Sequence, residues 1–349
     1  MQTVGILGLG RMGAQIARRL HKHKFKVIAW NRSPGPREEF SAQGGLTANT
    51  PQELVEKLAA TGQPKIVWLM LPAGDTTEEI LFGENGIANL LGKDDIVIDG
   101  ANSFYRDSQA RAEKLAQRGI YFFDCGTSGG VWGEQHGFSL MVGGPKDIWP
   151  QVEPIFKALA YPSDSPPSEE GLGEVNPLFF SPSPARLRLG EVQAGGRGGE
   201  ITGHYGLVGP SGAGHFVKMV HNAIEYGMME AIAEGFGVLK ASQFKDMDFS
   251  QIAHIWSKGS VVSSWLVDLA KNIFDTEDID KVVGVIAHTG EGKWTIEEAK
   301  KLGVAVPVME NSFQVRVDSE KPENQEIFSN KIVALLRKQF GGHEVKYKK

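Results

Sequence analysis

The chain has 349 residues, of which 41% are hydrophobic and 23% charged, with a net charge of −5 and a single cysteine, Cys125. This composition excludes fibrous and disordered proteins, because it supplies enough apolar surface for a core. It also excludes a strongly basic nucleic-acid or membrane binder, an internal disulfide and a multi-cysteine metal site. The chain opens without a leader-like segment and has no apolar stretch near the ~18 residues of a membrane span, so we expect a soluble, cytoplasmic protein.

The first 150 residues alternate short apolar runs with helical patterns, which is typical of a parallel, doubly wound sheet. The β-branched and aromatic runs predict strands at 3–9, 26–31, 65–71, 95–100, 120–124 and 138–144. Helices are expected between them, for example over 12–22, 51–60 and 106–118. Residues 1–160 are therefore predicted to form a Rossmann-like α/β domain.

Strand patterns end near residue 210, and helical patterns follow at 211–241, 249–272, 294–302 and 322–338. We therefore expect an all-helical domain over 206–349, in line with the two domains that the length predicts. The intervening segment 161–205 is rich in Gly, Pro and Ser and has no periodicity. It is expected to be a surface loop or a disordered insertion.

The sequence GLGRMG, with Gly8, Gly10 and Gly13, lies between the first predicted strand and the first predicted helix. In this context the first glycine permits a tight turn and the second lets the backbone approach a pyrophosphate. The third allows close packing of helix on strand, and the helix N-terminus offers free N–H donors. The motif therefore predicts a dinucleotide site.

Polar and small residues follow the other predicted strands. Asn31, Arg32 and Ser33 follow the second strand in place of an acidic residue, which favours a 2′-phosphate and hence NADP over NAD. Further runs at 71–74, 100–103 and 126–130 converge on the same edge of the sheet, where ligands bind in such folds.

One predicted helix has a stripe of polar residues at helical spacing: Lys218, His221, Asn222, Glu225 and Tyr226. The alternative is an ordinary solvated face, but such faces usually alternate Glu and Lys. The apolar remainder of this helix is also wide and is expected to be buried. We therefore favour a stripe that faces a cleft, with Lys218 as a base and Glu225 as an acid. Beside a nicotinamide, this pair indicates oxidation of a secondary alcohol with a further proton transfer.

Six motifs occur in order along the chain: GLGRMG, DGANSFYRDS, GTSGGVWGEQHGFSLMVGG, KMVHNAIEYGMMEA, GEGKWT and RKQFGGH. Together they resemble 6-phosphogluconate dehydrogenase, the decarboxylating enzyme of the pentose phosphate pathway, in its shorter bacterial form. The resemblance covers the chain except for 161–205. It implies a homodimer or homotetramer with NADP as cofactor, or NAD.

The resemblance also implies roles for single residues. Lys218 would take the proton of the 3-hydroxyl group, and Glu225 would protonate the enediol left after loss of carbon dioxide. Substrate-binding residues would be Asn102, Ser128, Gly129, Gly130, His221, Asn222, Tyr226, Arg316, Arg337 and His343. Cofactor-binding residues would be Gly8, Leu9, Gly10, Arg11, Met12, Gly13, Asn31, Arg32, Ser33, Leu71, Pro72, Ala73 and Asn102. Arg337 and His343 would come from the C-terminal tail of a partner subunit, and no metal is implied.

The sequence departs from the longer members of this family at Thr289 and Glu291, where they have a lysine and a threonine that contact the substrate phosphate. An acidic residue beside a phosphate is unfavourable, so this corner of the site is expected to differ, with Lys293 as a possible substitute. Two other functions stay open: a β-hydroxyacid dehydrogenase of the 3-hydroxyisobutyrate type, and a non-catalytic NADP-binding sensor.

Overall fold

The computed structural model describes residues 2–162, 203–288 and 290–348. Its contacts divide the chain into two compact units, the first made of Met1–Ala101 and Gln109–Gly214, the second of Asn102–Ser108 and His215–Lys349. The short segment after residue 101 therefore belongs with the second unit. The predicted insertion 161–205 falls mainly on residues outside the described ones, and the predicted domain boundaries stay predictions.

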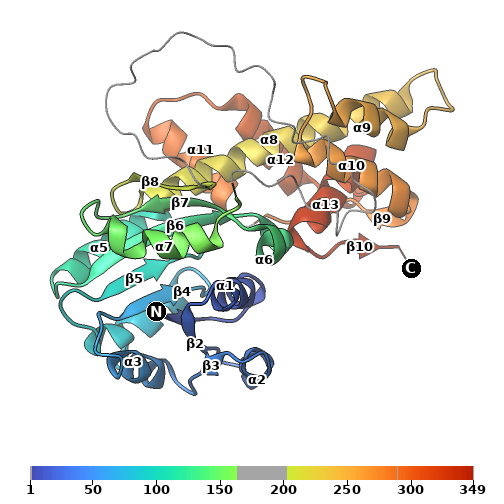
Figure 1. Ribbon diagram of the computed structural model, residues 1–349. Coiled ribbons are helices and arrows are strands. Elements are labelled where there is room, and N and C mark those ends of the chain that lie inside the picture. Colours follow the sequence, from blue (N-terminus) through green and yellow to red (C-terminus); the bar gives the residue numbers. More distant parts are fainter. Residues whose placement is uncertain (1, 163–202, 289, 349) are drawn as a thin grey trace, which may run out of the picture. The chain divides into compact units, whose positions relative to one another are not determined.

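The first unit contains an eight-stranded sheet of order β3-β2-β1-β4-β5-β6-β7-β8 (Figure 1). The strands are β1 Thr3–Leu7, β2 Lys26–Trp30, β3 Leu46–Thr47, β4 Ile66–Leu69, β5 Ile96–Asp99, β6 Tyr121–Ser128, β7 Ser139–Gly143 and β8 Tyr205–Gly209. Only the β6–β7 pairing is antiparallel. The six predicted strands and the Rossmann-like fold class are confirmed, whereas the two-residue β3 and the glycine-rich β8 were not predicted.

Helices cover both faces of this sheet because successive strand residues point to opposite sides. Ile66 and Trp68 of β4 join one core with α1 and α7, and Val67 and Leu69 join another with α3, α4 and α5. The helical elements are α1 Arg11–Lys22, α2 Pro34–Ala42, α3 Pro51–Ala59, α4 Asp75–Phe82, η1 Ile87–Asn89, α5 Tyr105–Ala116, η2 Gly130–Trp132, α6 Gly133–His136 and α7 Trp149–Leu159. The predicted start of α3 is confirmed, since the Thr50 side chain accepts a hydrogen bond from Glu53 N.

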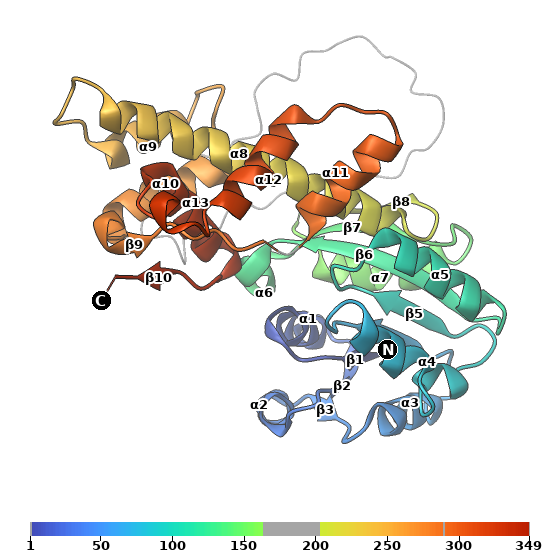
Figure 2. The same ribbon diagram turned by 180° about the vertical axis from the view of Figure 1, so that it is seen from behind.

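The second unit is built on the long helix α8 (Figure 2). Its elements are α8 Ala213–Ala241, α9 Phe249–Ser257, α10 Trp265–Thr276, η4 Ile279–Lys281, β9 Val282–Val283, α11 Glu291–Lys301, α12 Pro307–Asp318, η5 Pro322–Asn324, α13 Phe328–Gly341 and β10 Lys346–Tyr347. Side chains of α8, α9, α10 and α13 share one core. The predicted helical domain is confirmed, with the addition of one short antiparallel pair, β9–β10.

The prediction of a single helix over 249–272 is wrong. α9 ends at Ser257, because Lys258 is extended and Gly259 follows it with φ of +69°. The Ser264 hydroxyl accepts from Val267 N and caps the start of α10. The predicted 322–338 helix begins only at Phe328, and α12 was not predicted. In the described parts of the chain, none of the helices combines the length and the apolar character needed to cross a membrane.

Candidate active site

The glycine-rich loop between β1 and α1 has the geometry of a dinucleotide site. Gly8 has φ of +102°, and a Cβ there would lie 2.3 Å from Met70 O. A Cβ on Gly13 would lie 1.9 Å from Gly8 O, so both positions require glycine. None of the described residues lies within 4 Å of a Cβ on Gly10, the N-cap residue of α1. A pyrophosphate can therefore approach the backbone at the N-terminus of α1.

The end of β2 is tied to this loop and presents an exposed cation. Asn31 Oδ1 accepts a hydrogen bond from Leu9 N at 3.0 Å, and its amide donates to Ser33 O at 3.2 Å. Arg32 and Ser33 are exposed, and Ser33 precedes α2 without making a side-chain cap bond. This end of β2 has no carboxylate to repel a 2′-phosphate.

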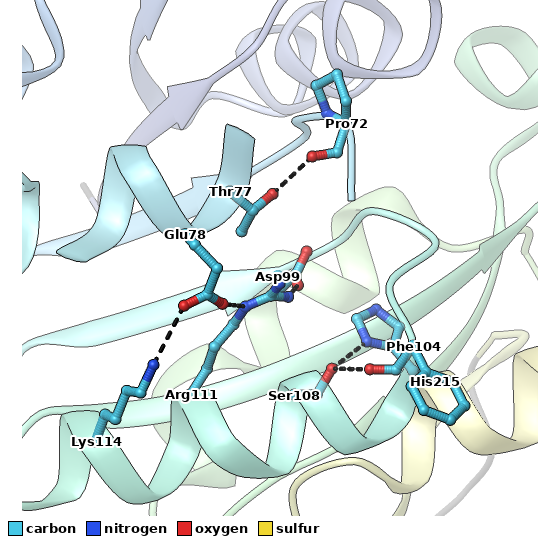
Figure 3. Close-up of polar contacts among 9 residues, drawn as sticks. All are labelled: Pro72, Thr77, Glu78, Asp99, Phe104, Ser108, Arg111, Lys114 and His215. Carbon is cyan, nitrogen blue, oxygen red and sulfur yellow. Dashed lines mark hydrogen bonds and ion pairs between the residues drawn. The ribbon is translucent and has the colours of Figure 1, made fainter. Parts of the chain in front are cut away.

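The ends of β4 and β6 form turns at the same edge of the sheet. After β4, Leu71 is buried, while Pro72 and Ala73 are exposed. The turn is closed by the Thr77 hydroxyl, which donates to Pro72 O at 2.9 Å (Figure 3). Gly129 and Gly130, after β6, have φ of +135° and +54°.

The residues that lead into α8, up to Gly214, belong to the first unit and contact its antiparallel strands. Gly212 N donates to the buried Asp124 Oδ1 at 2.5 Å. A Cβ on Gly214 would lie 2.4 Å from Met141 O.

In the second unit the polar stripe of α8 forms a contact network. Lys218 is only 6% exposed, and its Nζ donates to Asn222 Oδ1 at 2.8 Å. The same Nζ lies 3.3 Å from His221 Nδ1, which is 4.0 Å from Glu225 Oε2. The four side chains thus meet on one helix face, as their spacing predicted.

Burial shifts the pKa values of Lys218 and Glu225, at the two ends of this network, in opposite directions. Loss of solvent lowers the pKa of Lys218, although the charges of Glu225 and Glu291 oppose that shift. Loss of solvent raises the pKa of Glu225, against the charges of Lys218, Arg316 and Arg337. The amine is therefore moved toward a neutral base and the carboxyl toward a neutral acid.

Two buried arginines lie beside this stripe. Arg316 of α12 is 1% exposed, and its guanidinium carbon is 3.3 Å from the centre of the Tyr226 ring. Its three nitrogens have no hydrogen-bond partner among the described residues, and burial lowers its pKa to about 10. Arg337 of α13 is also buried, and its charge interacts with those of Arg316 and Glu225. Two neighbouring cations, one of them with unused donors, suit a dianion such as a phosphate monoester.

Arg337 therefore lies near Glu225 within a single chain, without a partner subunit. His343, half-buried, packs edge-on against Phe340. The exchange of the C-terminal tail between subunits stays a prediction.

Asn102 is exposed and opens the 102–108 segment of the second unit. This segment is held to α8 and α11. Ser108 Oγ lies 2.7 Å from His215 Nδ1 (Figure 3), and Arg106 pairs with Glu298 at 2.9 Å. Asn102 thus stands on a segment fixed to the same unit as Lys218.

Two buried carboxylates lie close to the stripe: Glu230, which the sequence did not single out, and Glu291, which it placed beside the substrate phosphate without predicting its burial. Burial and the charge of Glu234 raise the pKa of Glu230 to about 7, while Arg316 opposes the shift. The Lys293 side chain is 61% exposed and lies 3.8 Å from Glu297, which leaves it on the surface. Thr289 lies outside the described residues. Within the described ranges, no three His, Cys, Asp or Glu residues are grouped as a metal site would require.

The expected burial of the apolar side of α8 is only partly correct. Met219 and Met229 are buried, but Val217, Ile224 and Met228 are exposed in the single chain. These three residues follow one another at i, i+7 and i+11 and therefore share a face of the helix.

Comparison with known proteins agrees with this geometry. Two family models match: the NAD binding domain of 6-phosphogluconate dehydrogenase over residues 3–165, and the 6-phosphogluconate dehydrogenase C-terminal domain over residues 214–347. The NAD(+)-dependent, decarboxylating 6-phosphogluconate dehydrogenase of Haloferax volcanii is 34% identical over 98% of both chains. This chain belongs to the 6-phosphogluconate dehydrogenase family.

Longer members of the 6-phosphogluconate dehydrogenase family match as well. The NADP(+)-dependent enzyme of Bacillus subtilis is 32% identical over 93% of this chain and 62% of its own. The structure of the Plasmodium falciparum enzyme, solved in complexes with its cofactor NADP+ and with its substrate 6-phosphogluconate, has a TM-score of 0.74 at 26% identity. That match covers 92% of this chain and 62% of the other. The resemblance stated from the six motifs is confirmed.

Proposed function

We propose that the protein oxidises and decarboxylates 6-phosphogluconate to ribulose 5-phosphate and carbon dioxide, with reduction of a nicotinamide dinucleotide. The observation that carries this proposal is the partly buried polar stripe of α8 with the two buried arginines of α12 and α13 beside it. The second unit thus combines an amine with lowered pKa, a carboxyl with raised pKa and two buried guanidinium groups. The family membership supports the same reaction.

In this reaction Lys218 removes the proton of the 3-hydroxyl group, which its depressed pKa favours. The dinucleotide, when bound, accepts the hydride from carbon 3. Lys218 then returns its proton to the carbonyl oxygen as carbon dioxide leaves, so that the electron pair of the broken C–C bond is held as an enediol. Glu225 gives its proton to the terminal carbon of the enediol and completes the ketose.

The remaining substrate contacts are proposals that follow from charge and position. Arg316, Arg337 and Tyr226 would hold the phosphate, since two buried cations and a phenol lie together there. His343 of a partner subunit would complete the part of the site that binds the phosphate. The sugar acid itself would be held by Asn102, Ser128, Gly129, Gly130, His221 and Asn222.

The cofactor site fits a dinucleotide, because none of the described residues lies within 4 Å of a Cβ on Gly10 at the N-terminus of α1. Its proposed contacts are Gly8, Leu9, Gly10, Arg11, Met12, Gly13, Asn31, Arg32, Ser33, Leu71, Pro72, Ala73 and Asn102. We propose NADP as the preferred cofactor because the exposed Arg32 stands beside the N-terminus of α2. Arg32→Asp should reverse the preference. An unchanged ratio of kcat/KM for NADP and NAD would refute this role.

We also propose a homodimer or homotetramer. Val217, Ile224 and Met228 are exposed on one face of α8, and such a row of apolar side chains is typical of a subunit interface. Sedimentation of the wild type and of Ile224→Glu would test this, with a smaller species expected for the variant.

The experiment that tests the proposed function follows absorbance of the reduced nicotinamide with 6-phosphogluconate and each cofactor, together with release of carbon dioxide. One carbon dioxide per reduced nicotinamide is expected. A β-hydroxyacid dehydrogenase would reduce the cofactor with 3-hydroxyisobutyrate and release none, and a sensor would bind the cofactor without turnover.

A further inference from the structure

A third buried carboxylate lies beside the proposed base and acid, and the proton transfers described above do not use it. Glu291 is the first residue of α11 and is 4% exposed. Its Oε2 atom is buried and has no hydrogen-bond partner among the described residues. An acidic residue at a helix N-terminus interacts favourably with the helix dipole. A solvent-exposed carboxylate would give the same stabilisation. Burial without a partner is unfavourable and indicates a further role.

Two contacts fix the start of α11 along the stripe of α8. The Thr295 hydroxyl donates to Met219 O, next to Lys218, at 2.9 Å. A Cβ on Gly292 would lie 2.6 Å from Tyr226 Cε2, next to Glu225. Glu291 directly precedes Gly292, so its carboxylate is held within electrostatic range of both the proposed base and the proposed acid.

The charge of Glu291 acts on both of them. It raises the pKa of Lys218 against the effect of burial, and it raises the pKa of Glu225 in the same direction as burial. The other charged or titratable groups around this point are His221 and Tyr226 on α8, Arg316 on α12 and Arg337 on α13. Further along α11, Glu298 is paired with Arg106.

We propose that Glu291 is a positioning residue for the two proton transfers, a fixed buried anion that acts through Lys218 and Glu225 without touching the reacting atoms. It stabilises the ammonium group that forms when Lys218 takes the hydroxyl proton. It also keeps Glu225 protonated until the enediol is present. This role rests on the proposed function and adds to it a buried carboxylate that the proposed proton transfers do not use.

The test is the pH dependence of kcat/KM in Glu291→Gln. Removing the anion lowers the pKa of Lys218 and of Glu225 together, so both limbs of the profile should move to lower pH by about one unit. The direction is the same whichever group titrates first. Glu291→Asp, which keeps the charge, should restore the wild-type limbs. Glu297→Gln, a half-exposed carboxylate on the same helix, should leave them unchanged.

A second readout needs no turnover. In the unliganded enzyme, the rate at which acetic anhydride labels Lys218 is followed against pH by peptide mass spectrometry, with Lys245 as the internal reference. The pH midpoint of Lys218 labelling should be lower than in the wild type in Glu291→Gln, and also in a second neutral variant, Glu291→Thr. An inactive wild type would refute the proposed function and still leave this test intact.

Two outcomes overturn the proposal. If the limbs and the labelling midpoint of Glu291→Gln stay at the wild-type pH and only its stability falls, then Glu291 acts only by stabilising the N-terminus of α11. Limbs that move in opposite directions would mean that its charge does not act on both groups.

Discussion

Two arginines of the described chain are at most 1% exposed, Arg111 in the first unit and Arg316 in the second, and they differ in their partners. In the first unit Arg111 donates to Asp99 at 2.8 Å and to Glu78 at 2.7 Å, and Lys114 reaches the same Glu78 carboxylate (Figure 3). In the second unit Arg316 lies against the ring of Tyr226, and none of the ion pairs among the described residues involves it.

The difference separates a charge that holds the fold from one that is kept for a ligand. A buried charge with close, hydrogen-bonded partners loses much if one partner is removed. A buried cation without them destabilises the free protein, and a bound anion relieves that penalty. In the described part of the second unit, Glu230 and Glu291 also have one buried oxygen each without a hydrogen-bond partner, but an anion would not relieve the burial of those carboxylates.

The largest expected effect on activity comes from removing the proposed general base, Lys218. Lys218→Ala should lower kcat by about 10²–10⁴-fold, because it removes a general base, while the affinity for NADP changes little. Steady-state kinetics and a fluorescence titration with NADP would measure both. Lys240→Ala, at an exposed lysine of the same helix, is the matched control. Full activity in Lys218→Ala would refute the assigned mechanism.

Arg316→Met tests the arginine without hydrogen-bond partners. The KM for 6-phosphogluconate should rise by about 30-fold or more, as expected when a buried charged contact worth at least about 2 kcal/mol is lost. The free energy of unfolding without substrate should stay equal or rise, because an unpaired buried charge is removed. A clear loss of stability with an unchanged KM would make Arg316 a structural residue like Arg111.

Arg111→Met tests the paired arginine and should lower the stability without changing the KM for the substrate. The free energy of unfolding should fall by about 3–5 kcal/mol, because Asp99 is left fully buried without its cation. Urea unfolding measures this loss, and the double variant with Asp99→Asn should recover part of it. In the folded fraction, the KM for the substrate should match that of the wild type.

The smallest expected effect concerns Glu230, whose pKa is raised to about 7 by burial and by Glu234, against the charge of Arg316. The folded protein holds this proton more tightly than the unfolded chain, so stability should fall as the pH rises from about 4.5 to about 7. Glu230→Gln should remove this dependence and raise the free energy of unfolding at pH 8 by about 1–3 kcal/mol. If the free energies of unfolding of Glu230→Gln at pH 5 and pH 8 differ as much as those of the wild type, this prediction is wrong.

The sequence predicted those parts of the fold that local pattern determines. The β-branched runs predicted six strands, because buried parallel strands are nearly continuous apolar runs. The break between α9 and α10 was missed, although Gly259 and Ser264 mark it in the sequence. α12 was missed because its polar and apolar residues show little helical periodicity.

For the site, spacing was enough to group Lys218 with Asn222 and Glu225, because all three lie on one helix. It could not show that Glu291, more than sixty residues away in sequence, is buried against that stripe. Nor could it show that Arg316 lacks a partner, since pairing depends on which elements pack around a side chain. These properties come from tertiary packing, and sequence pattern does not report them.

The central claim is that Arg316, the buried arginine of the second unit without a hydrogen-bond partner among the described residues, is kept for the substrate. Calorimetric titration of 6-phosphogluconate into the wild type, Arg316→Met and Arg111→Met tests it most directly. The account predicts binding to the wild type and to folded Arg111→Met, with loss of at least about 2 kcal/mol in Arg316→Met alone. Equal affinity in the wild type and Arg316→Met would contradict it.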